Sequence, residues 1–456
     1  MKNLFEEFSP KTLKEWNDKI ISDLKGDCFE SLIWNNSENI RINPIYHQES
    51  VSKTNNDVSH QHSNWEIEQT LQKPSNKKVL ANLNSGATAL LLRNFPSEYL
   101  EEVLENVWVQ HIQTSFQSNS IETHLDAFIA LLEKRKLDYN SIKGSLHYDP
   151  LMDGLKNGQF QGDLWENLES IQDKVQAIPA YKGICIQAHE YPNAGATITQ
   201  ELAFITAQLS EYFANSNKLS PHKIQISMGI STNYFFEIAK YRAVRILWTQ
   251  LLKAYNKEQT KLDLRAENSI RTSTLYDPYV NILRNTSQCM SAALGGANTI
   301  NVNSFNAAYI KEDDFGQRIA RNISLILKEE SHFNKVNDPS AGSYYIEYLT
   351  NELSENAWKL FQEIEANGGW LKNVKTNTIQ GMIEENAEQQ EEDLKAGTKV
   401  LLGTNLYPND EEKMTSKIEK SLSTNRKAEK DFRPLNTCRL SMKMDLERLA
   451  KEGNHA

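Results

Sequence analysis

Residues 183–228 read GICIQAHEYPNAGATITQELAFITAQLSEYFANSNKLSPHKIQISM, and this stretch decides the fold. A short β-rich run opens it at 183–187, and a second run closes it at 223–228. Between the two runs, apolar side chains recur at the spacing of one helix face: Ile198, Leu202, Ile205, Leu209 and Tyr212. A strand, an amphipathic helix and another strand in this order indicate a βαβ unit with parallel strands.

The same alternation continues toward both ends of the chain. The candidate strands are 65–71, 88–93, 108–113, 145–148, 183–187, 223–228, 262–265 and 299–302. Helical stretches separate them, the clearest being 197–213 and 235–255. Eight strand–helix repeats are what a (β/α)8 TIM barrel of about 250 residues requires. A doubly wound α/β sheet alternates in the same way, but the count of eight favours the barrel.

Three regions are predicted along the chain: an N-terminal arm and linker at 1–64, the TIM barrel at 65–342, and a helical C-terminal extension and tail at 343–456. Leu13, Trp16 and Ile20 predict a helix in the arm, with Ser9-Pro10 as its cap. Residues 47–64 are polar and rich in turn formers, as expected of a linker.

The C-terminal extension is predicted to begin with a helix at 343–370. The acidic run Glu384–Asp393 is typical of a solvated face or a mobile segment. The charged residues that follow are compatible with further helix.

Charge and cysteine content exclude several classes of protein. The formal net charge is -10, which disfavours general binding to nucleic acid or to an anionic membrane. Cys28, Cys185, Cys289 and Cys438 form no CxxC pair, so neither a disulfide framework nor a zinc site is indicated. The N-terminus lacks a signal-peptide core, and no apolar stretch approaches the roughly 18 residues of a membrane span. We expect a soluble, cytoplasmic protein.

Motifs that carry chemistry are few. GxGxxG, GxxxxGK[ST], HExxH and GxSxG are all missing from the sequence. His189 and Glu190 follow the 183–187 strand, where a TIM barrel places its active site, so position alone makes them acid/base candidates or merely solvated loop residues. The segment Gly295–Ser304 contains Asn298 and Asn301, which could bind a ligand or satisfy loop backbone.

Several blocks of the chain, in order, resemble the methylmalonyl-CoA mutase family. The most specific is Asp338-Pro339-Ser340-Ala341-Gly342-Ser343-Tyr344-Tyr345-Ile346-Glu347. Further blocks are Asp277–Arg284 running into Ala293–Gly296 and Asn303–Phe305, Phe236–Lys240 with Arg242-Ala243, Asn193–Ala196 with Gln200–Phe204, and Leu24–Gly26 with Pro44–Tyr46. The resemblance implies a TIM barrel and a reaction in which adenosylcobalamin supplies the radical that interconverts (R)-methylmalonyl-CoA and succinyl-CoA.

The chain departs from the catalytic members of that family at each functional position. No histidine lies in the D-x-H-x-x-G motif of the cobalamin domain, whose histidine ligates cobalt in those members. His189 and Glu190 stand where catalytic members have an adjacent Tyr-His pair, and Asn298 and Asn301 replace a catalytic Gln and His. The first strand, 65–71, has no tyrosine in place of the family's active-site tyrosine. The resemblance therefore implies no catalytic, cofactor-binding or metal-binding residue in this chain.

Some mutases of this family pair a catalytic large chain with a smaller homologous chain. The resemblance implies that this chain is such a non-catalytic small subunit, in a heterodimer whose large chain binds adenosylcobalamin. Phe5, Phe8 and Trp16 are candidates for the contact with that chain, or they pack on the barrel itself. The alternatives are a catalytic acyl-CoA mutase barrel that uses a separately encoded cobalamin-binding subunit, and a scaffold that binds acyl-CoA without chemistry.

Whether the barrel admits CoA depends on which side chains point inward. Catalytic members line the barrel axis with small polar residues, which leaves room for the pantetheine of the substrate. Bulky residues would exclude it, and Ile184, Ile186, Ile224 and Ile226 hint at such a filled axis.

Overall fold

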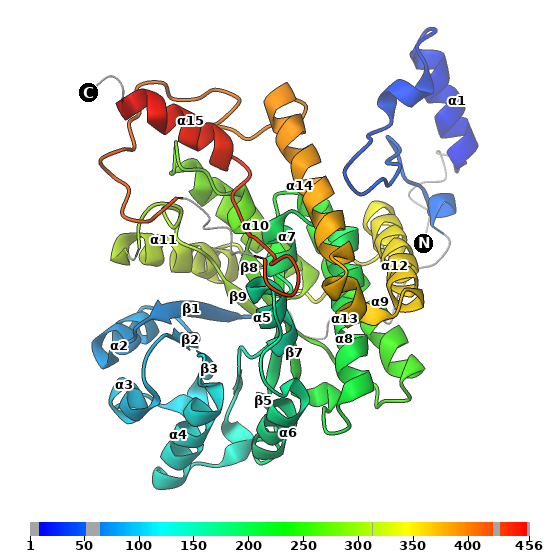
Figure 1. The fold of residues 1–456 in the computed structure, drawn as a ribbon. Coiled ribbons are helices and arrows are strands. Elements are labelled where there is room, and N and C mark those ends of the chain that lie inside the picture. Colours follow the sequence, from blue (N-terminus) through cyan, green and yellow to red (C-terminus); the bar gives the residue numbers. More distant parts are fainter. Residues whose placement is uncertain (1–8, 52–63, 312, 423–428, 454–456) are drawn as a thin grey trace, which may run out of the picture.

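The computed structural model describes residues 9–51, 64–311, 313–422 and 429–453. A curled parallel sheet surrounded by helices forms its centre (Figure 1). The strands are β1 Glu66–Gln72, β2 Ala89–Arg93, β3 Gln113–Gln117, β4 Gly144–Ser145, β5 Tyr181–Lys182, β6 Ile184–Ile186, β7 Ile224–Ile230, β8 Asp263–Asn268 and β9 Thr299–Asn301. Seven of them pair in the order β3-β2-β1-β9-β8-β7-β6, and β4 pairs with β5.

Backbone contacts join these two sheets into one closed ring. Thr114 N donates to Lys143 O at 3.0 Å and His147 N to Phe116 O at 2.8 Å, so β4 lies beside β3. β5 and β6 are parts of one strand interrupted only at Gly183, so pairing passes from β4 to β7. A Cβ at Gly144 would lie 2.0 Å from Thr114 O, so only glycine permits this close approach. The ring has eight positions, and the prediction of a TIM barrel rather than a doubly wound sheet is confirmed.

Helices cover the outside of the barrel between successive strands, as Figure 1 shows. They are α2 Asn76–Asn84, α3 Leu100–Val103, α4 Ile121–Lys134, α5 Pro150–Asn157, α6 Leu164–Val175, α7 Glu190–Ala194, α8 Ile198–Asn215, α9 Tyr234–Ala254, α10 Val280–Gly295 and α11 Asp314–Leu325. The two helices expected at 197–213 and 235–255 correspond to α8 and α9. Among the described helices, none is long and apolar enough to cross a membrane.

The predicted strand at 108–113 is wrong. Val109–His111 forms a 3-10 turn, Trp108 is 70% exposed, and strand β3 begins only at Gln113. The apolar run before β3 belongs to the connection, whereas the strand itself carries polar residues on its inner face. A search for apolar periodicity therefore misses this strand.

The isoleucines that hinted at a filled axis face outward. Ile184, Ile186, Ile224 and Ile226 belong to the core packed between the strands and the helices. Because neighbouring side chains of a strand point to opposite faces, Gln225 and Ser227 point inward. The interpretation of these isoleucines as axis residues is therefore wrong, and the inner face is polar.

The C-terminal extension packs against one side of the barrel and over part of its carboxyl end. Its helices are α12 Tyr344–Ala366, α13 Gly369–Lys375, α14 Thr378–Ala396 and α15 Met442–Gly453. The helix expected at 343–370 corresponds to α12. The acidic run Glu384–Asp393 is a largely solvated face of α14. Residues 397–441 contain no helix within the described part, so the expectation of further helix holds only for α15.

The N-terminal arm is anchored by its second half. Helix α1, Leu13–Asp23, confirms the predicted helix, but Thr12 caps it rather than Ser9-Pro10, through a reciprocal bond with Glu15. Ile40 and Ile42 enter the main core, whereas α1 buries no residue. In Figure 1, α1 accordingly lies apart from α14. Most of the predicted linker lies outside the described residues.

Candidate functional site

His189 and Glu190 lie at the carboxyl end of the barrel, as their place after β6 predicted. His189 is buried, and its Nε2 is 3.9 Å from Glu190 Oε1. Lys156 from α5 donates to the same carboxylate oxygen of Glu190. Burial would raise the pKa of Glu190, but Lys156 and His189 outweigh burial and lower it. Glu190 is therefore held as a paired carboxylate rather than a proton donor.

The two asparagines of the 295–304 segment lie at different levels of the barrel. Asn301 ends β9 on the inner face, where its Oδ1 accepts from Thr70 Oγ1 at 3.3 Å. Asn298 precedes β9, and its side-chain oxygen accepts from Leu264 N at 2.9 Å at the start of β8. Asn301 thus shares the carboxyl-end region with His189 and Glu190, whereas Asn298 satisfies backbone at the opposite end.

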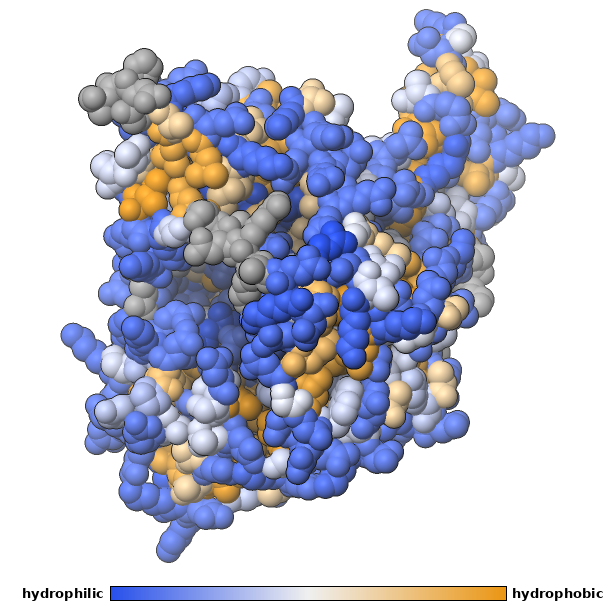
Figure 2. Space-filling model, viewed as in Figure 1, coloured by the Kyte–Doolittle hydropathy of each residue, from blue (hydrophilic) through white to orange (hydrophobic). Residues whose placement is uncertain are grey.

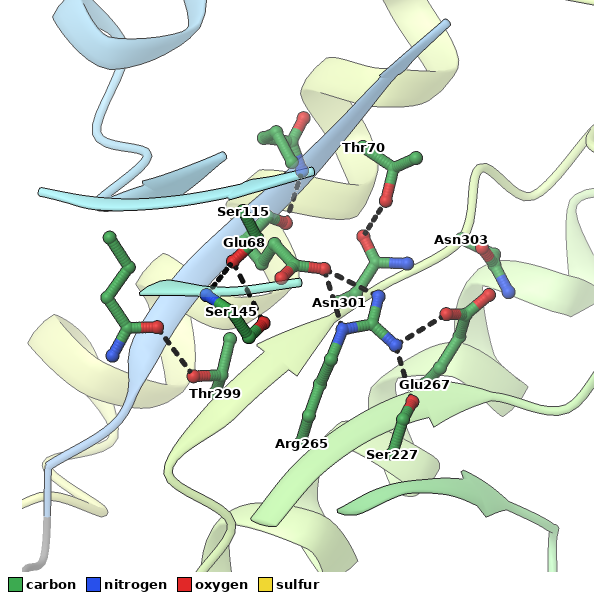
Figure 3. A network of polar contacts seen from close by, with 12 residues as sticks. Glu68, Thr70, Ser115, Ser145, Ser227, Arg265, Glu267, Thr299, Asn301 and Asn303 are labelled. Carbon is green, nitrogen blue, oxygen red and sulfur yellow. Dashed lines mark hydrogen bonds and ion pairs between the residues drawn. The ribbon is translucent and has the colours of Figure 1, made fainter. Parts of the chain in front are cut away.

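An arginine crosses the centre of the barrel. Arg265 of β8 donates from Nε to Glu68 Oε1 of β1 at 2.9 Å, and from Nη1 to Glu267 Oε2 at 2.7 Å. Its Nη1 also donates to Ser227 Oγ of β7 at 2.7 Å (Figure 3). Arg265 is fully buried and Glu68 is 2% exposed. The guanidinium and the two carboxylates therefore occupy the barrel axis between three strands.

A second group of polar contacts lies beside this arginine. Ser145 Oγ donates to Gln225 Oε1 at 2.9 Å and shares a second hydrogen bond with Ser115 Oγ at 3.1 Å, joining β4, β3 and β7. Thr299 Oγ1 donates to Gln113 Oε1 at 3.0 Å, joining β9 to β3 (Figure 3). Side-chain hydrogen bonds therefore connect non-adjacent strands across the interior of the barrel.

The charges of the central cluster stabilise one another. Burial alone would lower the pKa of Arg265, but Glu68 and Glu267 raise it above its usual value. Burial alone would raise the pKa of Glu267, but Arg265 and His189 lower it to about 2. Arg265 and Glu267 are consequently ionised at neutral pH, and the ion pair between them persists.

Glu68 and Arg265 were not among the residues singled out from the sequence. A signal was present, because Asp263, Arg265 and Glu267 alternate with apolar residues in β8, which places all three on one face of a strand. Charges on the inner face of a barrel strand are costly unless paired, so such a triplet indicates an interior ion-pair network.

The residues at this end do not fit a cobalt ligand. His147 and His189 follow β4 and β6 at this end, and both are buried, so neither presents an exposed ring to a corrin-bound cobalt ion. Among the described residues, no group of three His, Cys, Asp or Glu side chains is arranged to hold a metal ion.

The closed ring and its strand-end groups define the chain as a (β/α)8 barrel protein. Residues 97–449 match the family model described as methylmalonyl-CoA mutase. The methylmalonyl-CoA mutase small subunit of Porphyromonas gingivalis is 34% identical, over 98% of this chain and 78% of that protein. The small subunit of Propionibacterium freudenreichii subsp. shermanii is 32% identical, over 71% of this chain and 54% of that protein.

The methylmalonyl-CoA mutase of Rhizobium meliloti is 28% identical over 87% of this chain. The chain spans 64% of the length of that relative. This chain belongs to the methylmalonyl-CoA mutase family.

Proposed function

We propose that this chain is the non-catalytic small subunit of a heterodimeric methylmalonyl-CoA mutase. The observation that carries the proposal is the Arg265–Glu68 pair across the barrel axis. In catalytic members of the family the pantetheine of the substrate lies along this axis. Here a buried ion pair fills it.

Displacing this ion pair from the barrel axis would cost free energy. A ligand that displaced the Arg265 side chain would leave Glu68 and Glu267 buried without their partner. Breaking a buried ion pair in this way costs about 3–5 kcal/mol. The substrate would have to supply this energy before it made any favourable contact, so acyl-CoA binding by this chain is disfavoured.

The groups at the mouth are also unsuited to mutase chemistry. Glu190 is an ionised carboxylate where catalytic members present an imidazole to the substrate carbonyl. A fixed negative charge there opposes the negative charge that develops on the carbonyl oxygen. Asn301 cannot transfer a proton. In the proposal His189, Glu190 and Asn301 are degenerate pocket positions, and this chain alone is inactive. Asn298 was expected among them, but it lies at the opposite end of the barrel and does not belong to the pocket.

The proposed partner is the large, catalytic mutase chain. It would bind adenosylcobalamin and interconvert (R)-methylmalonyl-CoA and succinyl-CoA, because the described residues of this chain show no group arranged to hold a metal ion. The Porphyromonas and Propionibacterium relatives are named small subunits, which supports a larger partner.

Exposed residues of the N-terminal arm indicate where this chain would contact the large chain. Trp16 is 45% exposed and Ile21 is 53% exposed on α1, so the alternative that Trp16 packs on the barrel of its own chain is disfavoured. Phe5 and Phe8 lie outside the described residues. A groove of about 840 Å³ separates arm residues 34–39 from α14, and Trp34 lines it. Exposed apolar side chains on α1 and an open groove at residues 34–39 of the same arm suit contact with a partner chain better than contact with solvent.

The test is the molar mass of this chain mixed with the large mutase chain of the same organism, by light scattering on a sizing column. A one-to-one species is expected, with mutase activity absent from this chain alone and calorimetry detecting no acyl-CoA binding to it. Two separate peaks would overturn the proposal. Turnover by this chain with adenosylcobalamin and a separate cobalamin-binding protein would establish the alternative catalytic function.

A further inference from the structure

The carboxyl end of the barrel contains buried hydrogen-bond donors that lack acceptors. Arg93, the last residue of β2, is one of them: its Nε is buried and has no partner among the described residues. Leu90 and Leu92 face the outer core, so alternation along the strand turns Arg93 inward. Arg93 as a whole is half-buried, but an Nε–H group that is shielded from water and has no acceptor is costly.

The carboxylates nearest to Arg93 are already engaged. Glu267 lines the same cavity as Arg93, but its Oε2 accepts from Arg265. Glu68 Oε1 accepts from two nitrogens of Arg265, at 2.9 Å from Nε and 2.5 Å from Nη2. Arg265 therefore takes the hydrogen bonds that Arg93 would otherwise make. The remaining attraction of Glu267 for Arg93 acts through space.

Residues at neighbouring strand ends also have buried nitrogens that lack a hydrogen-bond partner among the described residues. His147, two residues after β4, is 3% exposed, and neither of its ring nitrogens has a hydrogen-bond partner in the described part of the chain. Gln187 and His189 follow β6, and each leaves one buried nitrogen, Nε2 and Nδ1 respectively, without a partner among the same residues. Native proteins leave few such groups unsatisfied, and each calls for an explanation such as a bound water or ion. Arg93 Nε and Gln187 Nε2 can only donate, whereas a neutral histidine ring has one donor and one acceptor nitrogen. Of these residues only Arg93 lines the cavity at this end, so Arg93 is the donor that calls for an acceptor there.

A cavity opens beside Arg93. Its volume is about 160 Å³, and Lys311 and Lys420 line it together with Arg93. Figure 2 shows a hydrophilic recess on this face, between α11 and β1. Two acids line the cavity as well, but Asp313 caps the first turn of α11 and Glu267 is paired with Arg265. Within the described part of the chain, the charged groups of this cavity that have no ion-pair partner are therefore the cations Arg93, Lys311 and Lys420, of which Lys420 Nζ donates to Ala307 O at 2.8 Å.

We propose that this cavity at the carboxyl end of the barrel binds a small oxyanion, a phosphate or a small carboxylate, with Arg93 as its principal ligand and Lys311 and Lys420 at its rim. A planar guanidinium matches the two oxygens of such an anion. The cavity is too small for a whole CoA ester, and it lies to one side of the axis that Arg265 closes. The ligand is thus a free anion rather than a thioester substrate.

The proposed site does not depend on association with a large chain. It is tested on the full chain alone by calorimetric titration with inorganic phosphate and, separately, with acetate, at constant ionic strength set with chloride. Binding of at least one of the two anions is expected, and their relative affinities identify the preferred oxyanion. Failure of both anions to bind would overturn the inference, whatever the light-scattering result.

Variants of Arg93 test whether the anion binds in this cavity. Arg93→Met is expected to weaken binding roughly tenfold or more, because a charge-assisted pair of hydrogen bonds is lost. Arg93→Lys keeps the charge and is expected to retain part of the affinity. Arg318→Met is the matched control, because Arg318 is exposed on α11 and does not line the cavity. Unchanged affinity in Arg93→Met, or an equal loss in Arg318→Met, would contradict the assignment of Arg93.

Discussion

Arg242 and Glu347 form a buried ion pair in which Arg242 Nη2 donates to Glu347 Oε1 at 2.7 Å. The same guanidinium pairs with Asp338 through Nη1. Arg242 lies on α9 of the barrel, and Asp338 and Glu347 are the first and last residues of the segment that most resembles the mutase family. The segment is therefore a structural clamp that fixes the start of α12 against the barrel.

Arg242→Met is expected to destabilise the chain by about 3–5 kcal/mol, because it leaves two buried carboxylates without their cation. The measurement is the free energy of unfolding in urea. Arg41→Met is the matched control, since the pair of Arg41 with Glu30 is solvent-exposed and contributes little. Equal loss of stability in both variants would contradict a clamp at Arg242.

The central pair of the barrel predicts strong coupling between two mutations. Arg265→Met is expected to cost about 3–5 kcal/mol, because Glu68 is left buried without its partner. Adding Glu68→Met removes that charge, so the double variant is expected to lose less than the sum of the two single losses. A double-mutant cycle in urea measures the difference, expected to be about 0.5–3 kcal/mol. If the losses in the free energy of unfolding were additive, Glu68 and Arg265 would not stabilise each other.

The sequence predicted the elements whose apolar residues face one core. The strand at 223–228 and the helix at 197–213 appear as β7 and α8 because their apolar faces pack between sheet and helix layers. The strand at 108–113 was misplaced because β3 presents Gln113 and Ser115 to a polar interior. A barrel lined with polar groups offers no inner apolar stripe to a pattern search.

The candidate site was predictable only where position in the chain fixes position in space. His189 and Glu190 follow a strand, and strand ends of a parallel barrel meet at one edge. The pairing of Glu68 with Arg265 spans 197 residues and depends on the register of β1, β9 and β8. A shift of one residue would turn either side chain outward, so this pair could not be found without the structure.

Burial of His147 and His189 predicts a loss of stability in acid. Burial is the largest effect on both, and it lowers the pKa of His189 and lowers that of His147 well below its usual value. The folded state therefore binds fewer protons than the unfolded state below the ordinary value of 6.5. Stability is then fully present above pH 6.5 and decreases as the pH falls below it.

His147→Gln removes one of these titrations. Below pH 6.5 its free energy of unfolding is expected to fall less steeply than that of the parent chain, by about 1.4 kcal/mol per pH unit. Urea unfolding at three pH values between neutral and mildly acidic measures the two slopes. His222→Gln serves as the control because His222 lies on the surface. Parallel slopes for the parent and His147→Gln would mean that His147 is protonated in the folded chain.

Glu38 anchors the N-terminal arm to the barrel. Its two carboxylate oxygens accept from Ile198 N and Thr199 N, each at 2.8 Å, at the amino end of α8. A carboxylate there meets both free backbone donors and the positive end of the helix dipole. Glu38→Ala is expected to cost about 1–2 kcal/mol and to loosen the arm.

Loosening of the arm is measured by limited trypsin cleavage after Arg41, whose neighbour Ile42 is held by a backbone bridge to Trp34. Cleavage in Glu38→Ala is expected to be faster than in the parent chain, while Glu98→Ala, which alters an exposed residue outside the arm, leaves the rate unchanged. Because Trp34 also lines the groove beside α14, the same variant is expected to weaken association with the proposed large chain. Faster cleavage with unchanged association would place the partner contact elsewhere than in this groove.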